Sequence, residues 1–212
     1  PEGESVARVA EKIRQAETAI STLEKNLKRY PADEITERST ITDPARIVDR
    51  ILFAGKFQDR CRETLDHLQR QLDWFQTWGE NINLKDLKYL REKGVFIRLY
   101  LLDRSNIDTL PKDQCVVAFP EREGKVPVAL FSRSASDKLH AKEAPLPSMP
   151  LAEVRSQMIR KKRQLQKVNA FYNRHKENLP VLQDYLNYLH DRLNSQKALA
   201  SMGTIDGRLV YL

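Results

Sequence analysis

The stretch LKDLKYLREKGVFIRLYLL, residues 84–102, is where the sequence changes from helical to strand periodicity. Its first half places leucines on one side of a short predicted helix, and Gly94 ends that helix. Its second half, Val95–Leu102, is rich in β-branched and aromatic residues, and its alternate residues share one face, which is typical of a strand. The sequence therefore predicts a small α+β unit at this point.

Two further strands are predicted in the same unit. Gln114–Phe119 and Val126–Phe131 are short apolar runs, and the polar segment 121–125 between them has the composition of a hairpin turn. A turn at 105–110 links the first two strands. We expect a distal α+β lobe over residues 81–149 that contains at least one antiparallel hairpin.

Two long amphipathic helices are predicted before this lobe. Apolar residues in 4–30 recur at alternating spacings of three and four, which are the a and d positions of a coiled coil. A polar loop follows at 31–42. Asp43-Pro44 then begins a second helix at 43–78, because Asp is a good N-cap and Pro is favoured at the first helical position. Residues 1–80 are thus predicted to be outgoing coiled-coil helices.

After the lobe, the heptad spacing predicts one long return helix at residues 150–203. Pro180 lies inside this segment and predicts a kink or a short break. Residues 204–212 have the composition of the start of a strand in a second, truncated lobe. The predicted fold class is therefore α+β, with a long antiparallel coiled coil of three long helices, capped by a small lobe with an antiparallel sheet.

The composition excludes several classes of protein. In 212 residues there are only two cysteines, so the chain is not a disulfide framework. No apolar run approaches the roughly 20 residues needed to span a bilayer, so we expect this fragment to be soluble. The sequence has no Gly-rich phosphate loop and no zinc-type Cys/His spacing. We therefore predict no catalytic residue, cofactor, metal site or small-molecule substrate, and an enzyme is the least expected class.

The positive charge is concentrated in the last part of the chain. The net charge is +7, and residues 151–212 carry 11 basic but only 5 acidic residues. The densest part, here called the basic cluster, consists of Arg160, Lys161, Lys162, Arg163 and Lys167. Three interpretations stand side by side: a solvated face balanced by acids of the other helices, a site for an acidic protein partner, and a site for nucleic acid or acidic lipid.

Two other features allow a structural and a functional interpretation. Trp74 and Trp78 lie one helical turn apart, and we favour packing at the junction of helices and lobe over a partner-binding anchor. His175 falls on the apolar seam of the return helix and is predicted to be a packed histidine. Cys61 and Cys115 are predicted to be buried, inert thiols.

The order of elements and two local motifs resemble the cytoplasmic half of subunit I of V-type ATPases and ATP synthases, the homologue of eukaryotic subunit a. KGVFIRLY at 93–100, followed by DTLP at 108–111, resembles that family's lobe strand and the turn after it. GRLVYL at 207–212 resembles the strand that leads into the family's Gly-Trp-hydrophobic-Pro motif. The resemblance covers most of residues 45–212.

This resemblance implies a non-catalytic stator arm of a rotary V-type ATPase or ATP synthase. Such an arm links the membrane ion-translocating part to the peripheral stalks during proton or sodium transport, at the cytoplasmic face of the membrane. The implied partners are the helical subunits of the peripheral stalk, which the lobe and the basic cluster would contact. The membrane rotor ring and the rotor-cap subunit would be reached through parts of the parent protein outside residues 1–212. The alternatives are a coiled-coil protein that binds nucleic acid through the basic cluster, and a coiled-coil adaptor whose seams pair between chains.

Overall fold

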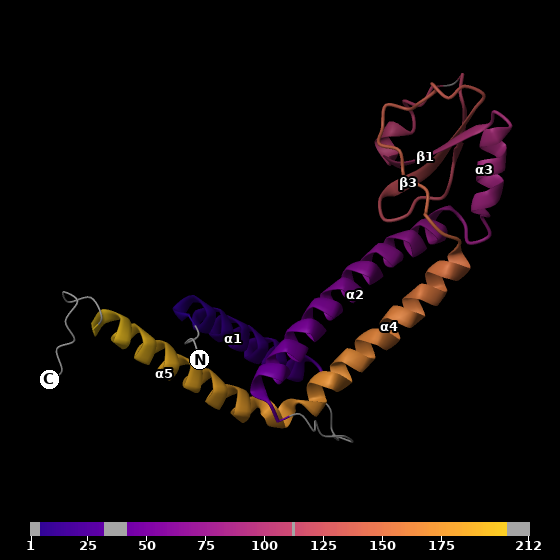
Figure 1. The fold of residues 1–212 in the computed structure, drawn as a ribbon. Coiled ribbons are helices and arrows are strands. Elements are labelled where there is room, and N and C mark those ends of the chain that lie inside the picture. The colour runs from indigo at the N-terminus through magenta and orange to yellow at the C-terminus, as the bar shows by residue number, and fades with distance from the viewer. Residues whose placement is uncertain (1–4, 32–41, 112, 203–212) are drawn as a thin grey trace. The chain divides into compact units, whose positions relative to one another are not determined.

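A computed structural model describes residues 5–31, 42–111 and 113–202 of the chain (Figure 1). It is an α+β protein, mostly helical, with a small three-stranded antiparallel sheet, so the α+β class and the antiparallel sheet are confirmed. In chain order the described elements are α1 (Val6–Arg29), α2 (Pro44–Trp78), α3 (Leu84–Glu92), β1 (Phe96–Asp103), η1 (Arg104–Asn106), β2 (Cys115–Ala118), β3 (Lys125–Ser132), α4 (Leu151–Arg174), η2 (Lys176–Asn178) and α5 (Leu179–Met202).

The chain forms two compact units. The helical unit contains the residues up to Glu63 and those from Lys162 onward, and the sheet unit contains Thr64–Lys161. Helices α2 and α4 each contribute residues to both units. The described part of the chain has no helix long and apolar enough to cross a membrane.

The core of the helical unit is formed by α1, the first part of α2, the second part of α4, and α5. Helix α1 runs antiparallel to α5 and lies along it (Figure 1). Asn173 Nδ2 donates to the Tyr30 carbonyl at 3.0 Å, and His190 lies 3.9 Å from a carboxylate oxygen of Glu17. The predicted seams supply most of this core, including the fully buried Val9, Ala16, Leu23, Ile47, Ile51, Tyr172 and Leu182. Ala19, also fully buried, lies outside the predicted seam.

The prediction of one continuous return helix is wrong, because the structure has two helices there. Helix α4 ends at Arg174, the 3-10 turn η2 follows, and α5 begins at Leu179. Pro180 lies in the first turn of α5, where its missing N–H has no intrahelical partner to lose. The break predicted near this proline is therefore confirmed, and three long helices are replaced by four, besides the short α3.

The sheet unit has β3 at its centre, in the order β1-β3-β2. Ala129 of β3 pairs with Leu99 on one side and with Val117 on the other. Both faces of the sheet are covered, which explains why β3 is apolar along nearly its whole length. One face packs on α2 and α4 with Leu68, Phe75, Leu99, Ala129 and Val154, and the other forms a second core with Tyr100, Leu102, Val128, Leu130 and Leu139.

Local turn and cap chemistry agrees with the sequence. Ala45 N–H donates to Asp43 Oδ1 at 3.0 Å at the start of α2. In the β2–β3 hairpin, Glu123 and Gly124 both have positive φ, at 50° and 76°, which is the pattern of a type I′ turn. The predicted strand at 204–212 and most of the predicted loop at 31–42 lie outside the described residues.

Candidate partner-binding site

The basic cluster lies along α4. Arg160, Lys162, Arg163 and Lys167 are exposed, and Lys161 is half-buried. Eight basic residues and no acidic residue occur between Glu153 and Glu177. Arg160 and Lys161 are the last α4 residues of the sheet unit, whereas the other three belong to the helical unit.

The five cations of the basic cluster make no ion pair with any described residue. Cations elsewhere in the described chain do form ion pairs. Arg98 Nη1 lies 2.8 Å from Glu143 Oε2, and Arg155 Nη2 lies 2.7 Å from Glu80 Oε2. The interpretation in which neighbouring acids balance the cluster therefore has no ion pair to support it in this part of the structure. A surface of unpaired cations attracts anionic partners, whether acidic proteins or nucleic acid.

A groove in the helical unit lies beside the second half of the basic cluster. It has a volume of about 760 Å³, and we call it the Phe53 groove. Its α2 wall consists of Asp49, Arg50, Phe53, Ala54 and Phe57, and its α4 wall of Gln164, Lys167, Val168 and Phe171. Lys167 is thus the one predicted site residue that lines it.

The heptad pattern of the sequence did not predict the Phe53 groove. Phe53 is 66% exposed, although phenylalanine is usually buried. The heptad seam of α2 runs through Ile47, Ile51 and Ala54, and Phe53 and Phe57 lie beside that seam at i, i+4 spacing. These two phenylalanines outside the seam were the sequence feature that could have indicated an exposed apolar surface.

Buried polar groups join the helices that form the walls of the groove. Gln58 Nε2 donates to Asn26 Oδ1 of α1 at 2.9 Å and to Asn169 Oδ1 of α4 at 3.3 Å. Cys61 Sγ lies 3.8 Å from Gln164 Oε1, and its thiol is buried as expected. Cys115 of β2 is exposed, so the buried thiol predicted there is wrong. These directional contacts specify how α1, α2 and α4 align in the helical unit.

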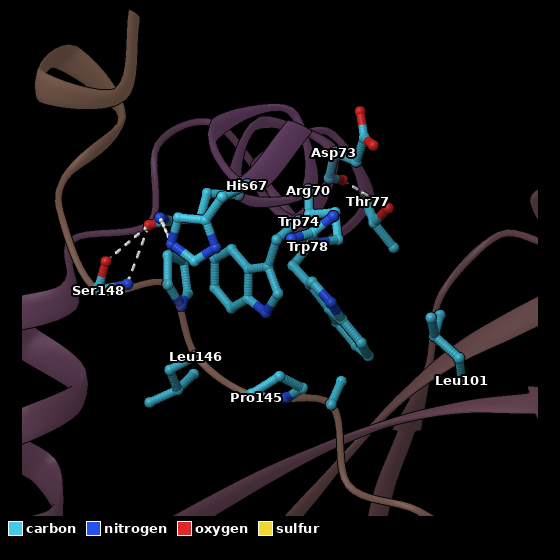
Figure 2. A pocket seen from close by; sticks show the side chains of 13 residues that line it. His67, Arg70, Asp73, Trp74, Thr77, Trp78, Leu101, Pro145, Leu146 and Ser148 are labelled. Carbon is cyan, nitrogen blue, oxygen red and sulfur yellow. Dashed lines mark hydrogen bonds between the residues drawn. The ribbon is translucent and has the colours of Figure 1, made fainter. Parts of the chain in front are cut away.

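The two tryptophans form part of a different recess, within the sheet unit. Trp74 and Trp78 are buried, and Trp78 meets Phe119 edge-to-face at 5.7 Å between ring centroids. Figure 2 shows the tryptophans and His67 projecting from α2 toward the segment of Pro145 and Leu146. The packing interpretation is therefore confirmed for the sheet unit, where both indoles belong to its apolar core.

The recess of about 460 Å³ beside the tryptophans is lined on one side by the segment 144–148. Gln71 Oε1 accepts from the Ser148 backbone N–H at 3.0 Å and from Ser148 Oγ at 3.1 Å (Figure 2). Gln71 Nε2 donates to His67 Nε2 at 2.8 Å, which requires the His67 tautomer protonated on Nδ1. The buried Gln71 thereby fixes the segment 144–148 against α2.

His175 is packed at the break between α4 and η2, as predicted. Asn178 Nδ2 donates to its Nδ1 at 2.9 Å, and the Phe171 ring centroid lies 4.5 Å from that of the imidazole. Burial lowers the pKa of His175, and the charges of Arg174 and Arg50 lower it further. Over the described ranges, no group of three or more His, Cys, Asp or Glu side chains is arranged to hold a metal ion.

Neither the models of known protein families nor the curated proteins match this chain.

Proposed function

We propose that the chain is a non-catalytic stator arm of a rotary V-type ATPase or ATP synthase. In this role it holds the peripheral stalks to the membrane part of the complex while the rotor turns, at the cytoplasmic face of the membrane. The helical subunits of the peripheral stalk are its direct partners.

The observation that carries this proposal is the way the α+β lobe is inserted into the helical part of the chain. Helix α2 leads into the lobe and α4 leads out of it, so the chain passes between the two units inside helices and not through loops. At a rise of about 1.5 Å per residue, the 35 residues of α2 span about 50 Å. Continuous hydrogen-bonded helices suit a part that must bear load.

The resemblance to subunit I adds to this argument. Its KGVFIRLY motif covers the end of the α3 region and the first part of β1, and DTLP follows the turn η1. In this proposal α4 and α5 together form the returning arm of an antiparallel coiled coil, with the break at η2 inside it. The arm is completed by α1, which runs antiparallel to α5.

The basic cluster supplies the proposed contact with the stalk. Its five cations have no acidic partner among the described residues. Carboxylates on an acidic surface of the stalk subunits would supply the missing ion-pair partners. Solvent-exposed ion pairs of this kind weaken as salt is raised, because the Debye length falls from about 10 Å at 0.1 M to 3 Å at 1 M.

The proposal is tested by tagging the encoding gene in its native host and purifying the tagged protein from detergent-solubilised membranes. We expect the catalytic nucleotide-binding subunits and the stalk subunits of a rotary ATPase to co-purify in fixed stoichiometry, as identified by mass spectrometry. Recovery of the tagged protein without any rotary ATPase subunit would contradict the proposal.

The contact itself is tested with the purified stalk subunits and two charge-reversal variants. We expect Lys162→Glu/Arg163→Glu to weaken stalk binding at least tenfold, and added salt to weaken wild-type binding. Lys25→Glu/Lys28→Glu is the matched control, because it reverses two exposed cations on α1. Equal binding by both variants would exclude the basic cluster as the contact.

The unpaired basic cluster also favours a second candidate, nucleic-acid binding. A protein that neutralises several phosphates loses duplex affinity steeply as salt rises, with a log–log slope of about −0.9 per phosphate contacted. Titration of labelled duplex DNA at 50 and 200 mM salt separates the candidates. Submicromolar binding with that slope, together with the absence of ATPase subunits from the purification, would favour nucleic acid.

A further inference from the structure

We propose that the Phe53 groove binds an acidic amphipathic helix of another protein. This inference goes beyond the stator function and does not depend on it. The groove shares Lys167 with the basic cluster, but its apolar floor belongs to the helical unit alone. Its test uses a defined peptide, so its failure would leave the stator proposal standing, and the reverse also holds.

The dimensions of the groove fit about two turns of a helix. Its α2 wall extends from Asp49 to Phe57 and its α4 wall from Gln164 to Phe171. At about 1.5 Å per residue, these walls are roughly 12 Å and 10 Å long. A helix that packs between two others meets them over about this length, through residues at i, i+3, i+4 and i+7.

The floor of the groove is apolar and aromatic. Phe53, Phe57 and Phe171 line it together with Val168 and Ala54. Phe53 is 66% exposed, whereas Phe57 and Phe171 are partly buried against the core of the helical unit. The rings of Phe57 and Phe171 are therefore held in place by the core. An apolar side chain that entered the groove would cover the exposed ring of Phe53.

Cations occupy both rims of the groove. Arg50 lines it from α2, and Lys167 lines it from α4. One turn earlier in each helix are Arg46 and Arg163, both exposed. Among the described residues, Asp49 is the only acid that lines the groove, and Arg50, Arg163 and Lys167 form no ion pair with any of them. The complementary occupant is a helix whose apolar stripe is flanked by Asp or Glu on both sides.

A helical occupant is favoured over an extended one, because both walls of the groove are helices. An extended peptide gains affinity from main-chain hydrogen bonds to an exposed sheet edge, and the groove offers none because it lies between α2 and α4. The α1 helix packs on another face of α2, where Gln58 binds Asn26, so it leaves the Phe53 side uncovered.

The test measures binding of a labelled 21-residue peptide to the full chain by fluorescence anisotropy. The probe has three heptads, with Leu at a and d, Glu at e and g, and Ala elsewhere. The control probe carries Lys in place of Glu. We expect the Glu peptide to bind at least tenfold more tightly than the Lys peptide at 100 mM salt, because the rims of the groove are basic. Equal or tighter binding of the Lys peptide would overturn the proposal.

Variants distinguish the groove from general attraction to a basic protein. Phe53→Ser removes only an exposed ring and should weaken Glu-peptide binding about tenfold. Arg50→Glu/Lys167→Glu should weaken it by at least as much. Tyr188→Ser on α5, which is 55% exposed, is the matched apolar control and should bind as the wild type does. Unchanged binding by Phe53→Ser would overturn the proposal.

A second copy of the chain is the competing occupant. Light scattering of the wild type and of Phe53→Ser, each at 10–100 μM, detects this case. We expect both proteins to have the same molar mass. A wild-type dimer that Phe53→Ser converts to a monomer would assign the groove to self-association and overturn the proposed occupant.

Discussion

Gln58 is the polar member of an otherwise apolar seam, and its side chain is only 3% exposed. The carbonyl oxygens of the Asn26 and Asn169 side chains both accept from its amide nitrogen. A buried network of this kind is stabilising when every member is satisfied and costly when one member is removed. It also explains how a seam of interchangeable aliphatic residues reaches one alignment.

We predict that Gln58→Leu lowers the free energy of unfolding by about 1–3 kcal/mol, because two acceptors lose their donor in the interior. Urea denaturation followed by circular dichroism measures this loss. The triple variant Gln58→Leu/Asn26→Leu/Asn169→Leu is the control and should recover part of it, since no polar group is then left unpaired. A more stable single variant would contradict the network's role.

His175 should make the stability of the chain depend on pH. Burial holds its pKa below the ordinary value of 6.5, with further lowering by Arg174 and Arg50. The unfolded chain therefore binds the proton more readily than the folded chain does. The contribution of His175 to stability is fully present above pH 6.5 and is lost as the pH falls through the folded pKa.

We therefore predict that lowering the pH from 7.5 to 5.5 reduces the free energy of unfolding more for the wild type than for His175→Gln. Urea denaturation at a series of pH values measures, for each protein, the slope of the free energy of unfolding against pH. Comparing slopes cancels the packing change that the substitution itself introduces, and the remaining histidines are common to both proteins. Parallel slopes would show that His175 does not account for the pH dependence.

Among the elements, the β2–β3 hairpin depends most visibly on one residue type. Arg122 and Lys125 exchange two backbone hydrogen bonds of 2.8 and 2.9 Å around the Glu123-Gly124 turn. Both central residues have positive φ, which glycine adopts freely and glutamate does not. A Cβ added at Gly124 would meet no atom within 4 Å, so only backbone conformation opposes a side chain there.

The geometry of the hairpin predicts that two substitutions change the stability of the chain in opposite directions. Gly124→Ala should destabilise the chain by about 1 kcal/mol, because it forces a second side-chain-bearing residue into the left-handed region. Glu123→Asn should stabilise it by a few tenths of a kcal/mol, since Asn-Gly is the favoured type I′ pair. Thermal denaturation of both variants tests the pair. The same sign for both would contradict the turn assignment.

At the scale of the whole molecule, the net charge of +7 is concentrated in residues 151–212. The cations of the basic cluster are unpaired in the described structure, so the fold does not depend on their charge. Reversing the charge of exposed, unpaired side chains is therefore expected to leave the structure intact.

We predict that Lys162→Glu/Arg163→Glu changes the free energy of unfolding by no more than about 0.5 kcal/mol. Arg98→Ala is the contrasting control, because it removes a partly buried guanidinium that donates to Glu143 and to the Ala135 carbonyl. We expect this control to be the more destabilising of the two, as measured by urea denaturation. A larger loss in the double variant would show that the cluster has a structural role.

The sequence by itself determined most of the local structure. Periodicities of 3.5 and 2 distinguished the helices from the strands of the lobe, because side chains follow the geometry of the backbone that carries them. Asp43-Pro44, Glu123-Gly124 and Pro180 marked a helix start, a hairpin and a helix break, since each rule depends only on neighbouring residues. The basic cluster was visible because charge is a property of composition.

Only the tertiary structure decided which elements meet. The sheet order β1-β3-β2 and the antiparallel pairing of α1 with α5 arise from contacts distant in the sequence. So does the exposed position of Leu101 on β1, where Leu99 and Leu102 are buried. The Phe53 groove belongs to the same class. Its floor joins residues more than a hundred positions apart, and a heptad pattern reports the seam that two helices share but not the surface they leave uncovered.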